Sequence, residues 1–223
     1  ISLPWRLAWE ARGPADPSLL ESYAREQRPV AAHGSGEMAE AARKYMLGQN
    51  DAVRAMSGGA FANALTRTML GVRLDVDQSG DWSMVRTEPG PLRVGERIPD
   101  VTLHDGFGRP VRLHDLVDDS FVALYFTDVR RRPVLPADSP GLKHLIVSRR
   151  DAPIDSGLRE RSLFDVGDKF RQRAGCETDT VMLVRPDDHI AAIAPMREGL
   201  VEDIYRKITR SEAPAAAKAK ADA

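Results

Sequence analysis

Cysteine is the residue type best suited to covalent chemistry, and this chain contains one, Cys176. A single thiol has no partner for an intramolecular disulfide and is too few for a cysteine-based zinc site. Cys176 could be a reactive nucleophile, but it does not follow a strand at the start of a helix, where a thiol pKa is lowered. We therefore expect a structural Cys176. Such sparing use of cysteine fits a reducing, cytoplasmic location.

Histidines are the next candidates, for metal binding or for acid–base catalysis. The five histidines are scattered. His33 with Glu37, and His114 with Asp118, have the i, i+4 spacing that places two ligands on one face of a helix. Each pair offers only two ligands, in a segment without a clear helical pattern. We expect loop or surface histidines, and we identify no catalytic residue and no metal ligand.

Phosphate-binding and nucleic-acid-binding patterns are weak. The glycines near residues 34–36 and 57–59 do not follow a strand, so they do not match a dinucleotide-binding fingerprint. Arg130 to Arg132 is a short basic cluster in a chain of formal net charge -1. No apolar run reaches the roughly 20 residues that a membrane-spanning helix needs. We therefore expect no nucleic-acid partner and no membrane partner.

The element around which the chain is organised is the segment from Phe121 to Thr127. It is almost wholly apolar, which is typical of a strand buried on both faces of an α/β sheet. Ahead of it come a Pro-containing entry from Val94 to Asp100, an alternating run from Val101 to Leu103, a Gly-rich turn and a second short strand from Val111. The later segments are expected to cover this strand.

This order of parts resembles the opening of a thioredoxin-like or peroxiredoxin-like fold. Those enzymes place a nucleophilic cysteine directly after the apolar strand, at the start of a helix whose dipole lowers the thiol pKa. Here the corresponding residues, Asp128 to Pro133, include no cysteine. The resemblance therefore implies a thioredoxin-like domain without thiol-redox chemistry.

The remaining segments of this domain can also be predicted. Pro133 and Pro136 interrupt a helix, so we expect a loop as far as Pro140. The elements predicted after it are a buried strand over Leu142 to Val147, a helix over Ser162 to Arg173, a hairpin of Thr180 to Val184 with His189 to Ile193, and a final amphipathic helix over Leu200 to Ile208.

Two helices are predicted at the start of the chain. In the first, Leu3, Trp5, Leu7 and Ala8 form the inner face, Arg6 and Glu10 lie outside, and Gly13-Pro14 ends the helix. The second begins at Asp16-Pro17-Ser18 and carries Leu19, Leu20, Tyr23 and Gln27 along one face. Trp5 and Trp9, four residues apart, are expected to be core anchors rather than a substrate cage.

These helices resemble segments of FAD-dependent aromatic-ring hydroxylases of the phenol and 3-hydroxyphenylpropionate hydroxylase type. Ser2 to Ala8 resembles the family's NLAWKLA helix, and Leu19 to Ala31 resembles its LLDSYEAERRPVA segment at a matching separation. Ser2 and Pro4 depart from the family's Asn and Ala. Pro89 to Asp100 is similar to the "PG-x-R-x-PD" boundary that precedes a redox-inactive thioredoxin-like domain in the larger members. Val181 to Ala191 resembles a late LVRPDGHVA hairpin, with Asp188 where the family often has Gly.

The resemblance implies a parent enzyme that uses FAD, NADH or NADPH, and O2 to hydroxylate a phenolic or other aromatic substrate. The dinucleotide fingerprint lies upstream in the family and is absent from this sequence. We therefore expect a C-terminal part of a longer chain, inactive alone, that does not bind FAD tightly. Ser2 is the candidate cofactor-binding residue, at the edge of the flavin site. The implied partners are an upstream flavin-binding domain, the aromatic substrate, NAD(P)H and a second copy in a homodimer.

Pattern and resemblance together give an α/β chain in three parts. Residues 1–88 are interpreted as the helical tail of the FAD-binding monooxygenase domain and a linker, 89–212 as the thioredoxin-like domain, and 213–223 as a disordered tail. Within the linker, residues 37–47, 50–56 and 61–70 have helical character, and 72–76 alternates like a short strand. Two alternatives remain: a free-standing thioredoxin-like or peroxiredoxin-like enzyme, which the missing cysteine disfavours, and a free-standing redox-inactive interaction module.

Overall fold

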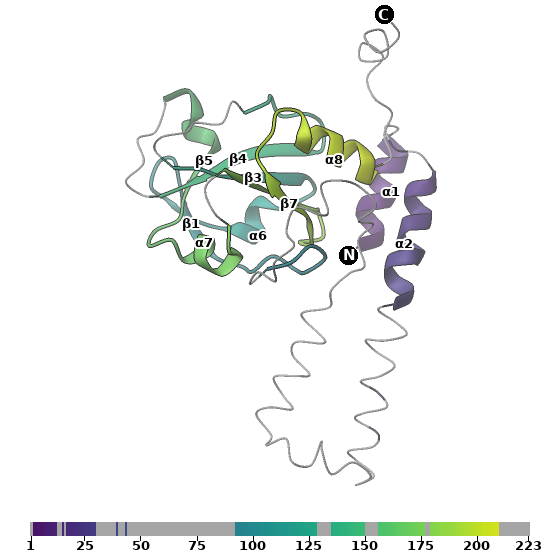
Figure 1. The fold of residues 1–223 in the computed structure, drawn as a ribbon. Coiled ribbons are helices and arrows are strands. Elements are labelled where there is room, and N and C mark those ends of the chain that lie inside the picture. Colours follow the sequence, from purple (N-terminus) through teal and green to yellow (C-terminus); the bar gives the residue numbers. More distant parts are fainter. Residues whose placement is uncertain are drawn as a thin grey trace, which may run out of the picture.

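The structure, a computed structural model, describes residues 2–12, 15, 17–29, 39, 43, 92–128, 135–149, 156–176 and 179–209. Apart from residues 39 and 43, the middle segment with its predicted helices and short strand lies outside this part of the chain. The basic cluster at 130–132 and the tail at 213–223 also lie outside it. Figure 1 shows the described elements as a sheet with helices around it.

The helices and strands follow one another along the chain, beginning with a pair of helices. In order they are α1 (Ser2–Arg12), α2 (Ser18–Pro29), β1 (Thr102–Asp105), β2 (Pro110–Arg112), α6 (Leu113–Leu116), β3 (Phe121–Phe126), β4 (Leu142–Ser148), η3 (Ser156–Arg161), β5 (Ser162–Phe164), α7 (Lys169–Ala174), β6 (Thr180–Val184), β7 (Ile190–Pro195) and α8 (Leu200–Thr209).

The described strands form one sheet in the order β2-β1-β5-β4-β3-β6-β7. β3, β4 and β5 are parallel to one another, while the β6–β7 hairpin is antiparallel to β3 on its other side. All six residues of β3 are buried, which confirms the predicted central strand. A parallel set flanked by an antiparallel hairpin and followed by a terminal helix confirms the α/β, thioredoxin-like class.

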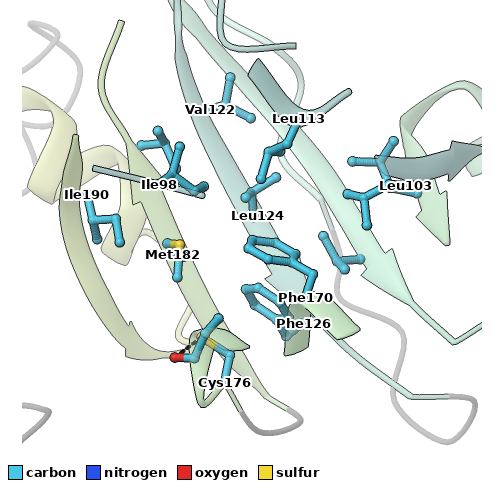
Figure 2. Packing of buried hydrophobic residues seen from close by; sticks show 14 of the residues in the cluster. Ile98, Leu103, Leu113, Val122, Leu124, Phe126, Phe170, Cys176, Met182 and Ile190 are labelled. Atoms are coloured by element: carbon cyan, nitrogen blue, oxygen red, sulfur yellow. Dashed lines mark hydrogen bonds between the residues drawn. The ribbon is translucent and has the colours of Figure 1, made fainter. Parts of the chain in front are cut away.

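Alternate residues of β3 feed two separate cores, because successive side chains of a strand point to opposite faces. Phe121, Ala123 and Tyr125 belong to the first core, with residues of α1, α2, β6, β7 and α8. Val122, Leu124 and Phe126 belong to the second core, with residues of α6 and α7. Figure 2 shows this second core, in which Phe170 lies beside Phe126 with ring centroids 5.4 Å apart, and to which Cys176 and Met182 also belong.

The predicted inner face of α1 is confirmed at Trp5 and Ala8 and is wrong at Leu3, Leu7 and Arg6. Arg6 is 1% exposed, whereas Leu3 and Leu7 are 37% and 48% exposed. The helix docks through Trp5 and Trp9, and Arg6 can be buried beside them because a carboxylate on α2 pairs with it. α1 therefore packs against α2 and the C-terminal sheet (Figure 1), a contact that the helical pattern alone did not indicate.

The predicted helix over residues 162–173 is also wrong in its first half. Ser162–Phe164 forms β5, paired in parallel with β4, and only Lys169–Ala174 is helical. Gly167 and Asp168 have positive φ of 79° and 55°, which breaks a helix at that point. The Asp165 carboxylate accepts hydrogen bonds from the first amides of α7, from Phe170 at 3.1 Å and Arg171 at 2.8 Å.

The later predictions are confirmed. β6 and β7 form the expected hairpin, and α8 buries Val201 and Ile204 while Tyr205 and Ile208 are partly buried. In the turn between β6 and β7, Asp188 has φ of 64°, the left-handed conformation that glycine adopts most easily. The aspartate therefore takes the backbone role that the resemblance gives to glycine.

Candidate functional site

The position that carries the nucleophile in thioredoxin-like enzymes directly follows β3. Here Thr127 and Asp128 follow β3, and the rest of the predicted segment, 129–133, lies outside the described residues. The Thr127 amide donates to the Val147 carbonyl at 3.1 Å, and its carbonyl accepts from Arg171 Nη2 at 2.8 Å. Cys176 is 3% exposed in the second core, and its Sγ lies 3.8 Å from the Ala174 carbonyl oxygen. The thiol is therefore enclosed by the protein, in the same apolar cluster as Phe126 at the end of β3.

Four buried charged side chains make the densest cluster of functional groups in the described part of the chain. We call Arg6, Glu26, Arg185 and Asp187 the four-charge cluster; their residues are 1%, 7%, 1% and 3% exposed. Arg6 comes from α1 and Glu26 from α2, while Arg185 and Asp187 come from the turn between β6 and β7. The cluster therefore joins the N-terminal helices to the C-terminal sheet.

Arg185 is the centre of this cluster. Its Nε and Nη2 donate to the two carboxylate oxygens of Asp187 at 3.0 and 2.6 Å. Its Nη1 and Nη2 donate to the two oxygens of Glu26 at 3.0 and 3.1 Å. Arg6 Nη2 lies 2.7 Å from Glu26 Oε2, and Arg6 Nε donates to Ser22 Oγ at 3.0 Å. Such forked, charge-assisted hydrogen bonds fix orientation as well as distance.

Trp5 lies within the same cluster. Its Nε1 donates to Asp187 Oδ2 at 3.1 Å. The guanidinium carbons of Arg6 and Arg185 lie 4.5 and 5.3 Å from the centre of its ring, within the range of cation–π attraction. The ring also packs edge-on against Phe121, with centroids 5.4 Å apart. Trp5 therefore links the charged cluster to the first core.

The charges of the cluster balance, with two arginines and two carboxylates. Burial acts to raise the pKa of Asp187, but Arg185 and His189 outweigh it and hold this pKa far below its usual value. Burial acts to lower the pKa of Arg185, and the carboxylates of Asp187 and Glu26 raise it above its usual value. The pKa of Arg6 is lowered, by burial and then by the charge of Arg185.

The arrangement suits anchoring better than catalysis. The four-charge cluster contains no thiol, hydroxyl or imidazole group. We also tested it as a flavin site: Arg6 and Arg185, which could hold a pyrophosphate, are already paired with carboxylates, and Phe121 covers the Trp5 ring. The residues of the four-charge cluster therefore do not suit an FAD molecule.

A second buried polar pair lies in the first core. Tyr125 Oη and His144 Nδ1 are 3.0 Å apart, and the two residues are 7% and 1% exposed. Burial raises the pKa of Tyr125 and lowers the pKa of His144. Asp138 Oδ1 accepts from the His144 amide at 3.0 Å and from Arg161 Nη2 at 3.0 Å. With so little exposure, the pair ties β3 and β4 to neighbouring loops rather than meeting a substrate.

Among the described histidines, His144 departs most clearly from the expected loop or surface position. His144, expected on a loop or the surface, is a buried residue of β4, since Tyr125 supplies a partner for its ring. Asp118 pairs with Lys143, with Nζ 2.8 Å from Oδ1, while His114 Nε2 lies 2.9 Å from the Ile98 carbonyl oxygen. Among the residues described, no group of three or more His, Cys, Asp or Glu side chains could hold a metal ion.

Other predictions fall at the limits of the described structure. Ser2 begins α1, but its side chain lies outside the described part of the chain. His33 and Glu37, one of the two pairs with i, i+4 spacing, also lie outside it. None of the described helices is both long and apolar enough to cross a membrane.

Sequence reasoning missed the whole four-charge cluster. One signal was present on α2, where Glu26 follows Leu19 at i+7 and therefore lies on the same face as that buried leucine. No comparable signal marks Arg6, Arg185 or Asp187, because a charged residue in a sequence is usually solvated. Their burial depends on partners up to 182 positions apart, as in the Trp5–Asp187 hydrogen bond.

Comparisons with known proteins point to one group. No protein-family model matches the chain. Pentachlorophenol 4-monooxygenase of Sphingobium chlorophenolicum is 28% identical over 228 residues, which cover 94% of this chain and 40% of that protein. Among solved structures, aklavinone-11 hydroxylase, in a complex with FAD and aklavinone, has a TM-score of 0.58 at 19% identity, covering 94% of this chain and 38% of that one. The flavin-dependent monooxygenase PieE, with FAD and substrate, has a TM-score of 0.58 at 17% identity, covering 95% and 43%.

The chain is therefore homologous to the C-terminal region of FAD-dependent aromatic hydroxylases. It spans about 40% of the length of the curated relative that it matches. The two solved structures share its fold.

Proposed function

We propose that this chain is the C-terminal portion of an FAD-dependent monooxygenase that hydroxylates a phenolic or other aromatic ring, with NADH or NADPH as reductant. The observation that carries the proposal is the similarity to pentachlorophenol 4-monooxygenase, which extends over 94% of the chain and 40% of that protein. The motifs of both N-terminal helices agree with it. In this view the flavin and most of the substrate contacts belong to the remaining part of the parent enzyme.

The proposed role of the chain itself is packing and dimer contact rather than catalysis. Its described residues provide a closed four-charge cluster and an enclosed Cys176, neither of which suits hydroxylation. Ser2 is the residue proposed at the edge of the flavin site. The division into residues 1–88, 89–212 and 213–223, the homodimer and the cytoplasmic location are part of the same proposal.

Flavin binding tests this proposal directly. The purified chain, titrated with FAD while flavin fluorescence is followed, should show no saturable binding at micromolar concentration. A pyrophosphate-binding helix N-terminus and its glycines supply several charge-assisted hydrogen bonds, each worth roughly 1.5–3 kcal/mol. The loss of a few of these hydrogen bonds raises the dissociation constant for FAD by several powers of ten.

The matched experiment expresses the chain together with its upstream coding sequence. An in-frame GxGxxG segment and a flavin absorbance spectrum in the purified product would support the proposal. Saturable one-to-one binding of FAD by the 223-residue chain alone would contradict the inactive role. Sedimentation of the chain tests the homodimer separately.

The second candidate is a free-standing, redox-inactive thioredoxin-like interaction module. The thioredoxin-like sheet with an enclosed Cys176 favours it, because such a domain offers binding surfaces without an accessible thiol. Upstream DNA without an in-frame GxGxxG segment would favour this candidate over the hydroxylase.

A further inference from the structure

We infer that the turn between β6 and β7 is a positioning element for α1. Arg185 and Asp187 hold the first half of the helix from outside it, and they thereby fix the place of Ser2 at its N-terminus. The inference concerns the fold of this chain. Only its consequence for flavin binding rests on the proposed function.

Polar contacts join α1 to the C-terminal part of the chain at three described points, the last of which is the exposed ion pair between Arg12 Nη2 and Asp119 Oδ2 at 3.8 Å. At the first, Trp5 donates to Asp187 at 3.1 Å, and Arg6 reaches Arg185 through the shared carboxylate of Glu26. At the second, one turn later, Trp9 Nε1 donates to Tyr205 Oη at 2.9 Å. The residues before Trp5 therefore depend on the first attachment for their order.

The first attachment is directional, whereas the apolar contacts around it are not. Apolar burial depends on area and tolerates small rotations and shifts of a helix. The forked hydrogen bonds of Arg185 and the indole N–H of Trp5 allow one geometry. Removing them leaves α1 tethered at Trp9 and free to open at its N-terminal end, as a local unfolding event.

The same turn offers a matched control in the next residue. Asp188 points to Arg97, with Arg97 Nη2 2.7 Å from Asp188 Oδ2, and takes no part in the four-charge cluster. Asp187→Asn and Asp188→Asn therefore make the same chemical change at neighbouring positions. Only the first removes a charge that holds α1.

Hydrogen exchange of the full 223-residue chain, followed by mass spectrometry, tests the inference. In Asp187→Asn, exchange of the α1 amides should rise by about tenfold or more, while β3 and β4 stay within about twofold of wild type. In Asp188→Asn, α1 should exchange as in wild type. Unchanged α1 exchange in Asp187→Asn would overturn the inference, and so would an equal rise in the sheet, which marks a general loss of stability.

Trp5→Phe keeps the experiment decisive if Asp187→Asn does not fold. This substitution removes one hydrogen bond from the turn and keeps an aromatic ring in the first core. It should raise exchange in α1 selectively, by several-fold. Exchange in α1 that remains at the wild-type rate would then overturn the inference.

The consequence for flavin is tested in the protein extended upstream. There, Asp187→Asn should weaken FAD retention and Asp188→Asn should not, although neither residue would touch the cofactor. An extended protein that binds no flavin at all refutes the proposed function, and the exchange of α1 in the 223-residue chain still decides the positioning role.

Discussion

The two faces of β3 are stabilised by different kinds of contact. On one face, Phe126 packs with Phe170, Cys176 and Met182 in an apolar core. On the other, large aromatic rings are combined with buried hydrogen bonds, including Trp5–Asp187 and Tyr125–His144. We call these the apolar face and the mixed face of β3. Side chains on the apolar face need only fill the available volume, whereas each polar group on the mixed face must also find its hydrogen-bond partner. The second kind of face is therefore the more sensitive to isosteric change.

The largest effect that we predict comes from the mixed face. Arg185→Met should lower the free energy of unfolding by about 3–5 kcal/mol, because it leaves Glu26 and Asp187 as buried carboxylates beside only one arginine. Urea denaturation followed by tryptophan fluorescence measures the loss. The control on the apolar face is Met182→Leu, which should cost less than about 1.5 kcal/mol. Equal losses would remove the contrast between the faces.

A smaller effect is expected where the backbone meets Trp9. Gly141 has φ of 79°, and a Cβ atom placed there would lie 2.5 Å from Trp9 Cζ2. Gly141→Ala should lower the free energy of unfolding by about 1–3 kcal/mol from strain, with a further loss from the displaced indole. Gly199→Ala is the control, since φ is 74° there and nothing lies within 4 Å. If Gly141→Ala lowers the free energy of unfolding no more than Gly199→Ala does, the side chains around Trp9 can rearrange to accommodate the added methyl group.

The mixed face should also respond to pH. Burial lowers the pKa of His144 in the folded protein, so the unfolded chain takes up its proton first as pH falls. The contribution of His144 to the free energy of unfolding is therefore fully present above the pKa of the unfolded histidine, about 6.5, and decreases as the pH falls below that value. Asp187, whose pKa is lowered in the folded state, adds a second loss below about pH 4.

Denaturation midpoints between pH 7.5 and 5 check the histidine step. His144→Asn should flatten the profile in this range, because asparagine does not titrate. A wild-type profile as flat as that of the variant would contradict the prediction.

The smallest effect concerns the turn itself. Asp188→Gly should change the free energy of unfolding by less than about 1 kcal/mol, because relief of the left-handed conformation offsets the lost ion pair with Arg97. Thermal denaturation measures the difference. A loss approaching that of Arg185→Met would place Asp188 among the residues on which the mixed face depends.

The central elements could be predicted because their signals are local. The apolar run at Phe121 to Phe126, the hairpin that ends in β7, and the apolar spacing of α8 each identify an element from neighbouring residues alone. The local sequence also showed that no cysteine occurs in Asp128 to Pro133, the segment that follows the predicted strand. The resemblance of the N-terminal helices to aromatic hydroxylases also came from short, continuous motifs.

The misses depend on contacts between distant residues. Ser162–Phe164 is a strand because β4 supplies a partner, although its apolar residues also suit a helix. Arg6 is buried because Glu26 lies opposite, and no periodicity could distinguish it from a solvated arginine. The candidate site was therefore less predictable than the sheet. The hydrogen bonds between Arg185 and Glu26 of α2, for example, join residues that are 159 positions apart in the sequence.

The close pair of indoles on α1 gives the molecule an optical signature. The Trp5 and Trp9 rings lie 5.9 Å apart at 87° to each other. Two identical chromophores at this separation share their excited states, so we expect each absorption band to split into two components with circular dichroism of opposite sign. Such a couplet in the circular dichroism spectrum requires both rings to be fixed. It vanishes once they turn independently, which gives the chain a built-in, label-free reporter of whether its first helix is seated.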